Sequence, residues 1–588
     1  MTTEQPSAVA PLLPSARTAP PGENAERGDP SGAETSARRG FLAKAFGVTA
    51  LLSAAGSALG LLRDLLLARY FGASQGTDAF LVAWTVPETA APLLIEDAMA
   101  FLMVPAFSLA LVLREERPHG PDPVRQLVRA TLPCLLLALC ALSAATALGA
   151  PQLVDLLAPG LADPGLAVTC TRVTALTILP FGVAGYLGSA LRAHHRFTAP
   201  AGIYVAYNLA ILTVLLTCHG VLGVTSAAVG VALGSLLMAG VLVGPFVRRL
   251  GEAWRLSEGR RAARPGVVVG SGQGLVLIPL AMLPVAAFTL TRQAQVFIER
   301  YLGSGLPPGT ISHLNYAAKV SQLAMTAAIL ICTVTFPLVA RALAAGDLAA
   351  ARDRVEKDLG QAAALVLVGT AFLMACAPSM VSLLFERGAF GPQDTAATAA
   401  VIRVYSFGLP AQALIGVMVR PYFSVRPVVR RADGPQTDDG GRRLLDWYPV
   451  AAMAVGLLVT VVVSLGATSR FGALGLAAGN AAGITTTAAL LLRGLLLRGI
   501  ALRLPKVLGG QARLLAAAVG AAVLGAPVGR LAANPLLSTL IGGACVLLAF
   551  AVLGTVFGAG EVRGPVLALV RAVNPSPPAA EGKLPDGR

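Results

Sequence analysis

Long apolar runs recur along this 588-residue chain, and they constrain its fold more than any other feature. Many are about 20 residues long, the length that a helix needs to cross the hydrocarbon core of a bilayer. Composition agrees, because hydrophobic residues make up 55% of the chain, charged residues only 13%, and the mean hydropathy is +0.70. A soluble domain carries about 25% charged residues, so a set of soluble domains is excluded. We predict an all-α polytopic membrane protein.

The formal net charge of +15 would suggest a nucleic-acid partner in a soluble protein. Here the basic residues lie in short connections between apolar runs, where they orient helices and meet anionic lipid headgroups. We therefore expect no nucleic-acid partner. The seven cysteines all fall inside apolar segments and form no C-x-x-C pair. They predict neither a disulfide framework nor a metal site.

The apolar runs give about fourteen candidate spans, with ends defined to within a few residues. The candidate spans lie near 41–68, 78–112, 126–150, 168–191, 199–218, 222–247, 275–300, 311–340, 360–385, 394–420, 447–467, 473–492, 511–529 and 535–558.

The connections between these spans alternate in charge. Connections after even-numbered spans are rich in arginine, whereas those after odd-numbered spans hold at most one basic residue each. The basic residues of the odd-numbered connections are Arg69, Arg300, Arg387, Arg470 and Arg530. By the positive-inside rule the arginine-rich side is cytoplasmic, so both termini are predicted to be cytoplasmic.

The two ends of the chain are polar. Residues 1–40 are rich in Pro, Ala, Ser, Gly and Glu, which predicts a disordered cytoplasmic tail, and residues 561–588 predict a second one. The first tail ends in Arg38-Arg39, which fits either a twin-arginine export signal or the basic flank of the first span. We favour the flank, because many more spans follow.

A sequence repeat divides the spans into two sets of six. Arg69-Tyr70-Phe71-Gly72 is similar to Arg300-Tyr301-Leu302-Gly303, and each is followed by a Gly-Thr pair. An offset of six helices is even, so the two copies share one orientation, as in transporters whose substrate site lies between two repeats. We predict an N-terminal lobe at 41–250 and a C-terminal lobe at 270–500. The last two spans, at 510–560, lie outside the repeat.

Ionisable residues inside spans are costly, at least ~2.5–3.5 kcal/mol each on insertion scales, so they mark candidate sites. Glu96 and Lys319 lie deepest in their spans, whereas Arg63 and Asp64 are near enough to one end to reach the interface instead. The ionisable residues inside the predicted spans are Arg63, Asp64, Asp78, Glu88, Glu96, Asp97, Arg172, Arg292, Glu299, Lys319 and Arg403.

Cations in a water-filled cavity suit an anionic substrate, particularly a phosphate. The acids would balance these cations in an empty site or couple transport to an ion. No G-x-x-x-x-G-K-[ST] motif is present and no soluble domain is large enough to bind ATP. We therefore expect no cofactor. We expect transport to be driven by an ion gradient or the membrane potential. We see no pattern that predicts an enzyme.

Several of these segments resemble the MurJ (MviN) family of lipid II flippases. The resemblance covers residues ~45–425 and rests on all of its motifs together. The matching segments are Leu59-Gly60-Leu61-Leu62-Arg63-Asp64, Ala68-Arg69-Tyr70-Phe71-Gly72-Ala73, Thr77-Asp78-Ala79-Phe80, Glu96, Val104-Pro105, Ala158-Pro159-Gly160, Arg196-Phe197, Leu314-Asn315-Tyr316-Ala317 and Leu384-Phe385-Glu386-Arg387-Gly388-Ala389-Phe390.

The resemblance implies a multidrug/oligosaccharidyl-lipid/polysaccharide exporter fold in the bacterial plasma membrane. Its two lobes would enclose a basic cavity for a lipid-linked pyrophosphate sugar, and the last two spans would hold the polyprenyl tail. By the resemblance, the substrate-binding residues would be Arg63, Asp78, Glu96 and Lys319. Further candidates are Asp64, Arg292 and Arg403. The expected partners are the lipid-linked substrate, membrane lipids and cell-wall synthesis proteins.

The chain also departs from the family pattern. Ser57, Ala91 and Pro92 stand where the family commonly has arginine, and Ala318 replaces an acid. These changes keep three alternatives to lipid II transport open: export of another polyprenyl-linked glycan or a small amphiphile, a non-transporting scaffold, and a membrane enzyme.

Overall fold

The computed structural model describes residues 30–96, 98–116, 122–258, 273–325, 339, 347–423, 439–497 and 500–564. By its internal contacts the chain divides into residues 1–48 and residues 49–588. The first unit holds the beginning of one helix, and the two halves and the site described below lie in the second unit.

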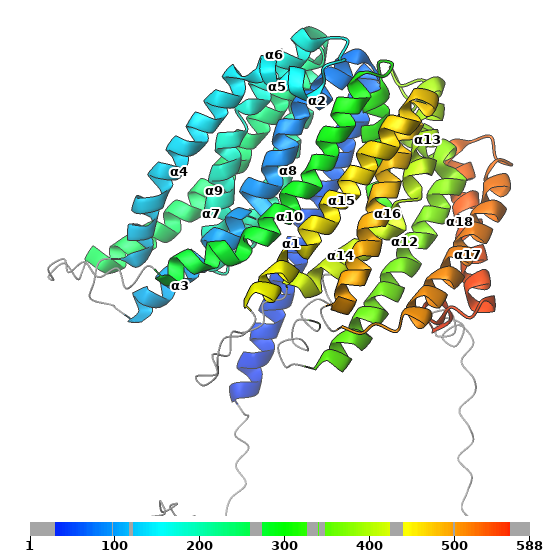
Figure 1. Ribbon diagram of the computed structural model, residues 1–588. Helices are drawn as coiled ribbons and strands as arrows, with labels where there is room; N and C mark the ends of the chain where they lie inside the picture. The colour runs from blue at the N-terminus through cyan, green and yellow to red at the C-terminus, as the bar shows by residue number, and fades with distance from the viewer. Residues whose placement is uncertain are drawn as a thin grey trace, which may run out of the picture. The chain divides into compact units, whose positions relative to one another are not determined.

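The described residues form helices and no strands, which confirms the predicted all-α class (Figure 1). Residues 310–325 form a further helix, the 310–325 helix. The other elements are α1 (Pro30–Phe71), α2 (Gln75–Ala91), the π-helix η1 (Pro92–Glu96), α3 (Ala98–Glu116), α4 (Pro123–Leu148), α5 (Ala150–Leu157), α6 (Pro164–Ala175), α7 (Ile178–Ala193), α8 (Thr198–Leu222), α9 (Thr225–Glu258), α10 (Gln273–Ser304), α12 (Leu348–Phe385), α13 (Pro392–Ser406), α14 (Leu409–Phe423), α15 (Asp439–Phe471), α16 (Ala473–Leu497), α17 (Leu504–Gly529) and α18 (Pro535–Val556).

Among the described residues, 11 helices are long and apolar enough to cross a membrane, or 12 if the bent pair α13 and α14 is one span. These match 12 of the predicted spans, so a multi-pass membrane protein is confirmed but the count of about fourteen is not. The seventh predicted span corresponds to α10, whose side chains are described only from residue 283, so this span is not tested over its full length. The eighth is described only in part, as the 310–325 helix.

One predicted boundary is wrong. Helix α1 begins at Pro30, so residues 30–40 are helical and do not belong to a disordered tail. Alanine, glutamate and arginine in this segment favour a helix, and proline is well tolerated in the first turn. Residues 1–29 and 565–588, and with them most of both predicted tails, lie outside the described residues.

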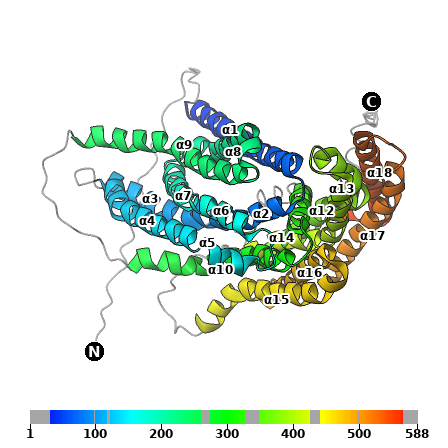
Figure 2. The same ribbon diagram turned by 90° about the horizontal axis from the view of Figure 1, so that it is seen from above.

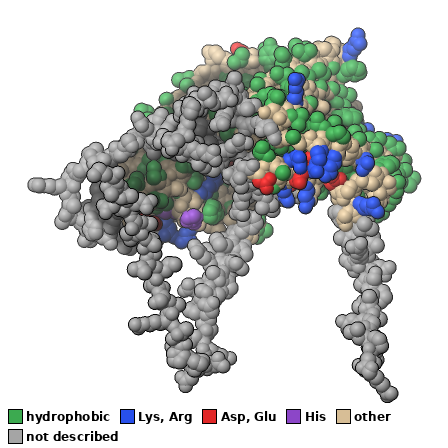
Figure 3. Space-filling view, turned by 60° about the horizontal axis from the view of Figure 1, so that its bottom comes forward, with side chains coloured by type: hydrophobic (Ala, Val, Ile, Leu, Met, Phe, Trp, Pro, Cys, Tyr) green, Lys and Arg blue, Asp and Glu red, His purple; other side chains and the backbone are tan. Residues whose placement is uncertain are grey.

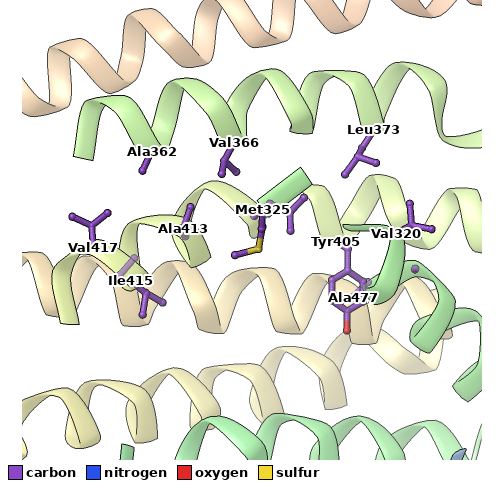
Figure 4. Packing of buried hydrophobic residues seen from close by; sticks show 14 of the residues in the cluster. Val320, Met325, Ala362, Val366, Leu373, Tyr405, Ala413, Ile415, Val417 and Ala477 are labelled. Atoms are coloured by element: carbon purple, nitrogen blue, oxygen red, sulfur yellow. The ribbon is translucent and has the colours of Figure 1, made fainter. Parts of the chain in front are cut away.

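Buried apolar side chains form two large clusters, which we call the N-terminal and C-terminal clusters. The N-terminal cluster runs from Leu67 to Phe246 and the C-terminal cluster mainly from Phe288 to Leu502. Figure 4 shows part of the C-terminal cluster, where side chains from α12, α13 and α14 meet those of the 310–325 helix. Leu67 packs in the first cluster and the adjacent Ala68 in the second, so the end of α1 contacts both halves.

Helices α17 and α18 pack against α12 at one edge of the C-terminal half (Figure 2). Their buried residues form a separate apolar cluster with one face of α12. Gly525 and Gly529 of α17 are one helical turn apart and lie against Gly542 of α18. Small residues at this spacing let two helices approach closely in a membrane, where packing replaces the hydrophobic effect as the main attraction.

Charged side chains fasten the connection between α16 and α17 to the beginning of α12. Arg503 donates to Glu356 Oε2 and to Asp353 Oδ1, each at 2.6 Å, and Lys506 lies 3.7 Å from Glu356. Figure 3, which turns this end of the molecule forward, shows basic and acidic side chains gathered beside mainly hydrophobic ones. Such a charged end is typical of a membrane protein face that meets water and lipid headgroups.

Candidate functional site

Asp78 joins the two halves at one end of the molecule. Ser74 accepts a hydrogen bond from Thr77 N and thereby caps α2, which places Asp78 in the first turn of that helix. The buried Asp78 carboxylate accepts hydrogen bonds from Gly309 N at 2.6 Å and from both N and Oγ of Ser312, at 2.7 and 2.6 Å. The first N–H groups of a helix lack partners within it. An acid of one half therefore caps the 310–325 helix of the other.

Two glycines bring the backbones of the halves into contact at the same end. Gly388 has φ of +67°, and a Cβ there would lie 2.2 Å from Arg69 O. Ala389 N donates to the same carbonyl at 2.8 Å. Gly309 has φ of +92°, and its Cβ would lie 2.6 Å from Ala73 O. Only glycine permits both this conformation and this approach. The connections that meet here all follow odd-numbered spans. Their contacts close the structure at that end.

A small pocket, with room for about one water molecule, lies between the halves on the other side of this contact. Arg63 and Asp64 lie on one wall, and Asn315 and Lys319 of the 310–325 helix lie on another. The full lining is Arg63, Asp64, Leu67, Phe80, Leu81, Trp84, Ile211, Leu215, Ala227, Asn315 and Lys319. The pocket therefore holds two cations, one contributed by each half.

Arg63 is held by contacts on three sides. Its Nε and Nη2 donate to Asp64 Oδ1 at 3.0 and 2.8 Å, and its guanidinium lies 4.6 Å from the centre of the Trp84 ring. Its Nη1 also lies 3.5 Å from Asn208 Oδ1. Asn208 Nδ2 donates to the carbonyls of Gly56 and Tyr204, so its oxygen faces Arg63. This arrangement positions a cation on the pocket wall and contradicts the alternative that Arg63 only reaches the membrane interface.

Lys319 shares an acid with a second cation. Lys319 Nζ lies 4.0 Å from Glu88 Oε1, and Arg300 Nη2 lies 3.8 Å from Glu88 Oε2. Arg300 is 2% exposed within α10. The alternation of charge between connections predicted that Arg300 lies in a connection. That placement is wrong: α10 continues to Ser304, and only Arg69 is exposed.

The remaining predicted residues lie elsewhere. Glu96 is exposed at the end of η1 and accepts a hydrogen bond from the Tyr204 hydroxyl of α8. Arg292 is exposed on α10. Arg403 donates to Met374 O of α12 at 3.2 Å, within the C-terminal half. The structure thus brings Arg63, Asp64 and Lys319 to one pocket but does not bring Glu96, Arg292 or Arg403 there.

Glu299 is a second buried acid, and its hydrogen bonds connect helices within the C-terminal half. Glu299 accepts hydrogen bonds from Tyr405 Oη and from Asn480 Nδ2, the latter at 2.6 Å, and from Gln295 Nε2 at 3.1 Å. All three partners donate to the Oε1 oxygen, which gives the buried carboxylate the hydrogen bonds that burial of a polar group requires. Glu299 therefore ties α10 to α13 and α16 inside the C-terminal half.

Sequence reasoning singled out Glu88 as a costly charge but gave it no partner, and it missed Arg300. One signal was available. Tyr301 and Leu302 continue the apolar pattern beyond Arg300, and the Gly-Pro turn signal begins only after Ser304. A helix that reaches the Gly305-Leu306-Pro307-Pro308 turn carries Arg300 inside the protein.

Comparisons with known proteins agree with this architecture. A family model described as lipid II flippase MurJ matches residues 67–430. The probable lipid II flippase MurJ of Rhizobium meliloti is 30% identical over 375 residues, which cover 62% of this chain and 67% of that protein. The lipid II flippase MurJ of Burkholderia cenocepacia is 27% identical over 408 residues, covering 64% of this chain and 73% of that one.

Solved structures agree in fold. A lipid II flippase MurJ in an inward closed conformation superposes with a TM-score of 0.67 at 17% identity, over 87% of this chain and 98% of that one. An inward-facing multidrug resistance MATE family transporter of the MOP superfamily gives 0.57 at 12% identity, over 76% and 95%.

Proposed function

Because the chain belongs to the lipid II flippase MurJ family, we propose that it moves lipid II across the bacterial plasma membrane by alternating access. Lipid II is an undecaprenyl-pyrophosphate-linked peptidoglycan precursor. Its headgroup is anionic and polar, so crossing the hydrocarbon core alone would carry a large desolvation cost. A flippase lowers this cost by giving the headgroup a polar path while the polyprenyl tail stays in lipid.

The observation that carries this proposal is the pair of cations on one pocket. Arg63 and Lys319 come from opposite halves and line the same space. A pyrophosphate has enough negative charge to contact both, and charge-assisted hydrogen bonds are about twice as strong as neutral ones. A ligand that engages both cations also connects the two halves, which is what alternating access between two repeats requires.

The contact at Asp78 supports a gate at one end. With this end closed, a headgroup reaches Arg63 and Lys319 only from the opposite, arginine-rich side. Breaking the Asp78 contacts and closing the arginine-rich side would expose the pocket to the other face. We propose that an ion gradient or the membrane potential drives this cycle, and that α17 and α18 provide the surface for the polyprenyl tail.

We propose that the closed end faces outward and that both termini are cytoplasmic, on the arginine pattern of the connections. The test is labelling of single cysteines in intact cells, after the native cysteines are replaced. Arg387→Cys, at an exposed position of the closed end, should react with an impermeant thiol reagent. Phe390 is unsuitable for this test because it is 1% exposed. Protection of Arg387→Cys in intact cells but not in inverted vesicles would contradict this orientation.

A second candidate is the export of another polyprenyl-linked glycan. It is favoured by the loss of three family arginines at Ser57, Ala91 and Pro92; in the structure Ser57 Oγ donates only to Ser53 O, at 3.1 Å. The membrane anchor and pyrophosphate would be the same, and the sugar would differ.

Complementation tests the first function against the second. A bacterial strain depleted of its own lipid II flippase should grow when it expresses this chain. If the strain expresses the chain in its membrane at the level of a functional relative and still does not grow, that result would contradict lipid II transport and favour the second candidate.

A further inference from the structure

Pro87 lies inside α2 and Pro92 begins η1, and each leaves a backbone carbonyl of α2 without its helical partner. Proline has no N–H, so Pro87 cannot bond to Ala83 O, nor Pro92 to Glu88 O. Thr174 of α6 donates its hydroxyl to Ala83 O at 3.0 Å. The carbonyl of Glu88 instead accepts from Gln293 Nε2 of α10 at 2.9 Å. The backbone at Glu88 is therefore attached to the opposite half of the protein.

The side chain of Glu88 lies between the two cations of that half. Its oxygens are 3.8 Å from Arg300 Nη2 and 4.0 Å from Lys319 Nζ, both longer than a hydrogen bond. Glu88 Oε2 and Arg300 Nε are buried and have no hydrogen-bond partner among the described residues. Glu88 thus neutralises charge without being bonded to either cation, and both have capacity for a closer contact.

The backbone around Glu88 permits such a change. Pro87 immediately precedes it, and the π-helix η1 begins at Pro92, one turn later. Prolines and π-helical turns are the usual sites at which helices bend. Glu88 therefore lies where helices usually bend, away from the capped start of α2.

We propose that Glu88 is an internal counter-anion that competes with the substrate for Lys319. In the empty pocket its charge is shared between Lys319 and Arg300. When an anionic headgroup binds Lys319, Glu88 moves onto Arg300 and closes that distance to a hydrogen bond. When the pocket opens to the other side, Glu88 returns to Lys319 and promotes release. The inference rests on the proposed function only for the identity of the anion.

The test is the binding of inorganic pyrophosphate to the purified full-length protein, measured by calorimetry. Glu88→Gln keeps the side-chain shape but removes the competing charge, so it should bind pyrophosphate up to roughly fivefold more tightly, about the effect of one ion pair. A merely structural role would instead weaken binding. The control Glu115→Gln changes the net charge equally at an exposed position of α3 and should bind as the wild type does.

A second set of variants tests the mechanism independently. Arg300→Gln removes the alternative partner, keeps Glu88 on Lys319 and should weaken pyrophosphate binding by up to roughly fivefold. Adding Glu88→Gln to it should restore tight binding, because no competitor then remains. In a Lys319→Ala background, Glu88→Gln should no longer tighten binding, since such coupling exists only between interacting residues.

The outcomes separate the two proposals. If wild type and Glu88→Gln bind pyrophosphate equally, the counter-anion role is wrong and the proposed function stands. The same conclusion follows if Glu88→Gln tightens binding without Lys319. If none of these folded proteins binds pyrophosphate, both the counter-anion and the anion-binding pocket of the proposed function are overturned.

Discussion

Lys319→Ala and Arg63→Ala should each abolish growth of a flippase-depleted strain, while the variant proteins still insert into the membrane. Each removes one of the two cations on the pocket between the halves. A charge-assisted contact contributes about 1.5–3 kcal/mol, so its loss should weaken headgroup binding by roughly ten- to a hundredfold or more. Colony formation and the amount of membrane-inserted protein are measured together.

Two controls accompany these variants. Lys319→Arg keeps the charge at a position where the family usually has arginine, and it should support growth. Arg172→Ala removes the same charge from an exposed position on α6, outside the pocket, and should also support growth. Full growth with Lys319→Ala at normal expression would contradict the assignment of Lys319 to the binding site.

Asp78→Ala should open the closed end of the molecule. The carboxylate accepts three hydrogen bonds from Gly309 and Ser312 of the opposite half, and it is 4% exposed. Loss of the three charge-assisted hydrogen bonds by which Asp78 caps the 310–325 helix should destabilise the closed conformation by at least ~3 kcal/mol. The closed conformation would then lose a factor of roughly a hundred or more in population relative to the open one.

Labelling from outside the cell measures this change. Asn315→Cys, which places a thiol on the pocket wall, should be protected from an impermeant reagent in the otherwise native protein. It should react quickly when combined with Asp78→Ala. Asp155→Ala, a loss of the same charge at an exposed position of α5, should leave the thiol protected. Unchanged protection in the Asp78→Ala protein would show that these contacts do not hold the end closed.

The order and class of the helices could be predicted from the sequence, because the length and spacing of apolar runs report directly on helices in a bilayer. A bend within a span is harder to predict than the span itself. Helices α13 and α14 are bent by 45° around Gly408, whose Cβ would lie 3.0 Å from Ala481 of α16. The hydropathy pattern shows one apolar run there, whereas the bend depends on contact with α16, which is distant in sequence.

The same limit applies to the site. Burial cost identified Arg63, Asp78 and Lys319 as unusual residues, since a charge in a span requires a partner. It could not predict that Asp78 would cap a helix of the opposite half. Nor could it predict that Glu96 would bond Tyr204, which is 108 residues away. Such pairs depend on how the two halves pack, which local periodicity does not encode.

The most direct measurement of the central claim is the movement of lipid II itself. The purified full-length chain is reconstituted into vesicles that contain fluorescent lipid II in both leaflets, and a membrane-impermeant reagent reports how much reaches the outer leaflet. Wild-type vesicles should expose the inner-leaflet lipid II, while vesicles with Arg63→Ala or Lys319→Ala should match protein-free ones. The claim would be contradicted if the Arg63→Ala and Lys319→Ala proteins exposed inner-leaflet lipid II at the wild-type rate. It would also be contradicted if the wild-type protein exposed no lipid II under conditions in which an active relative does.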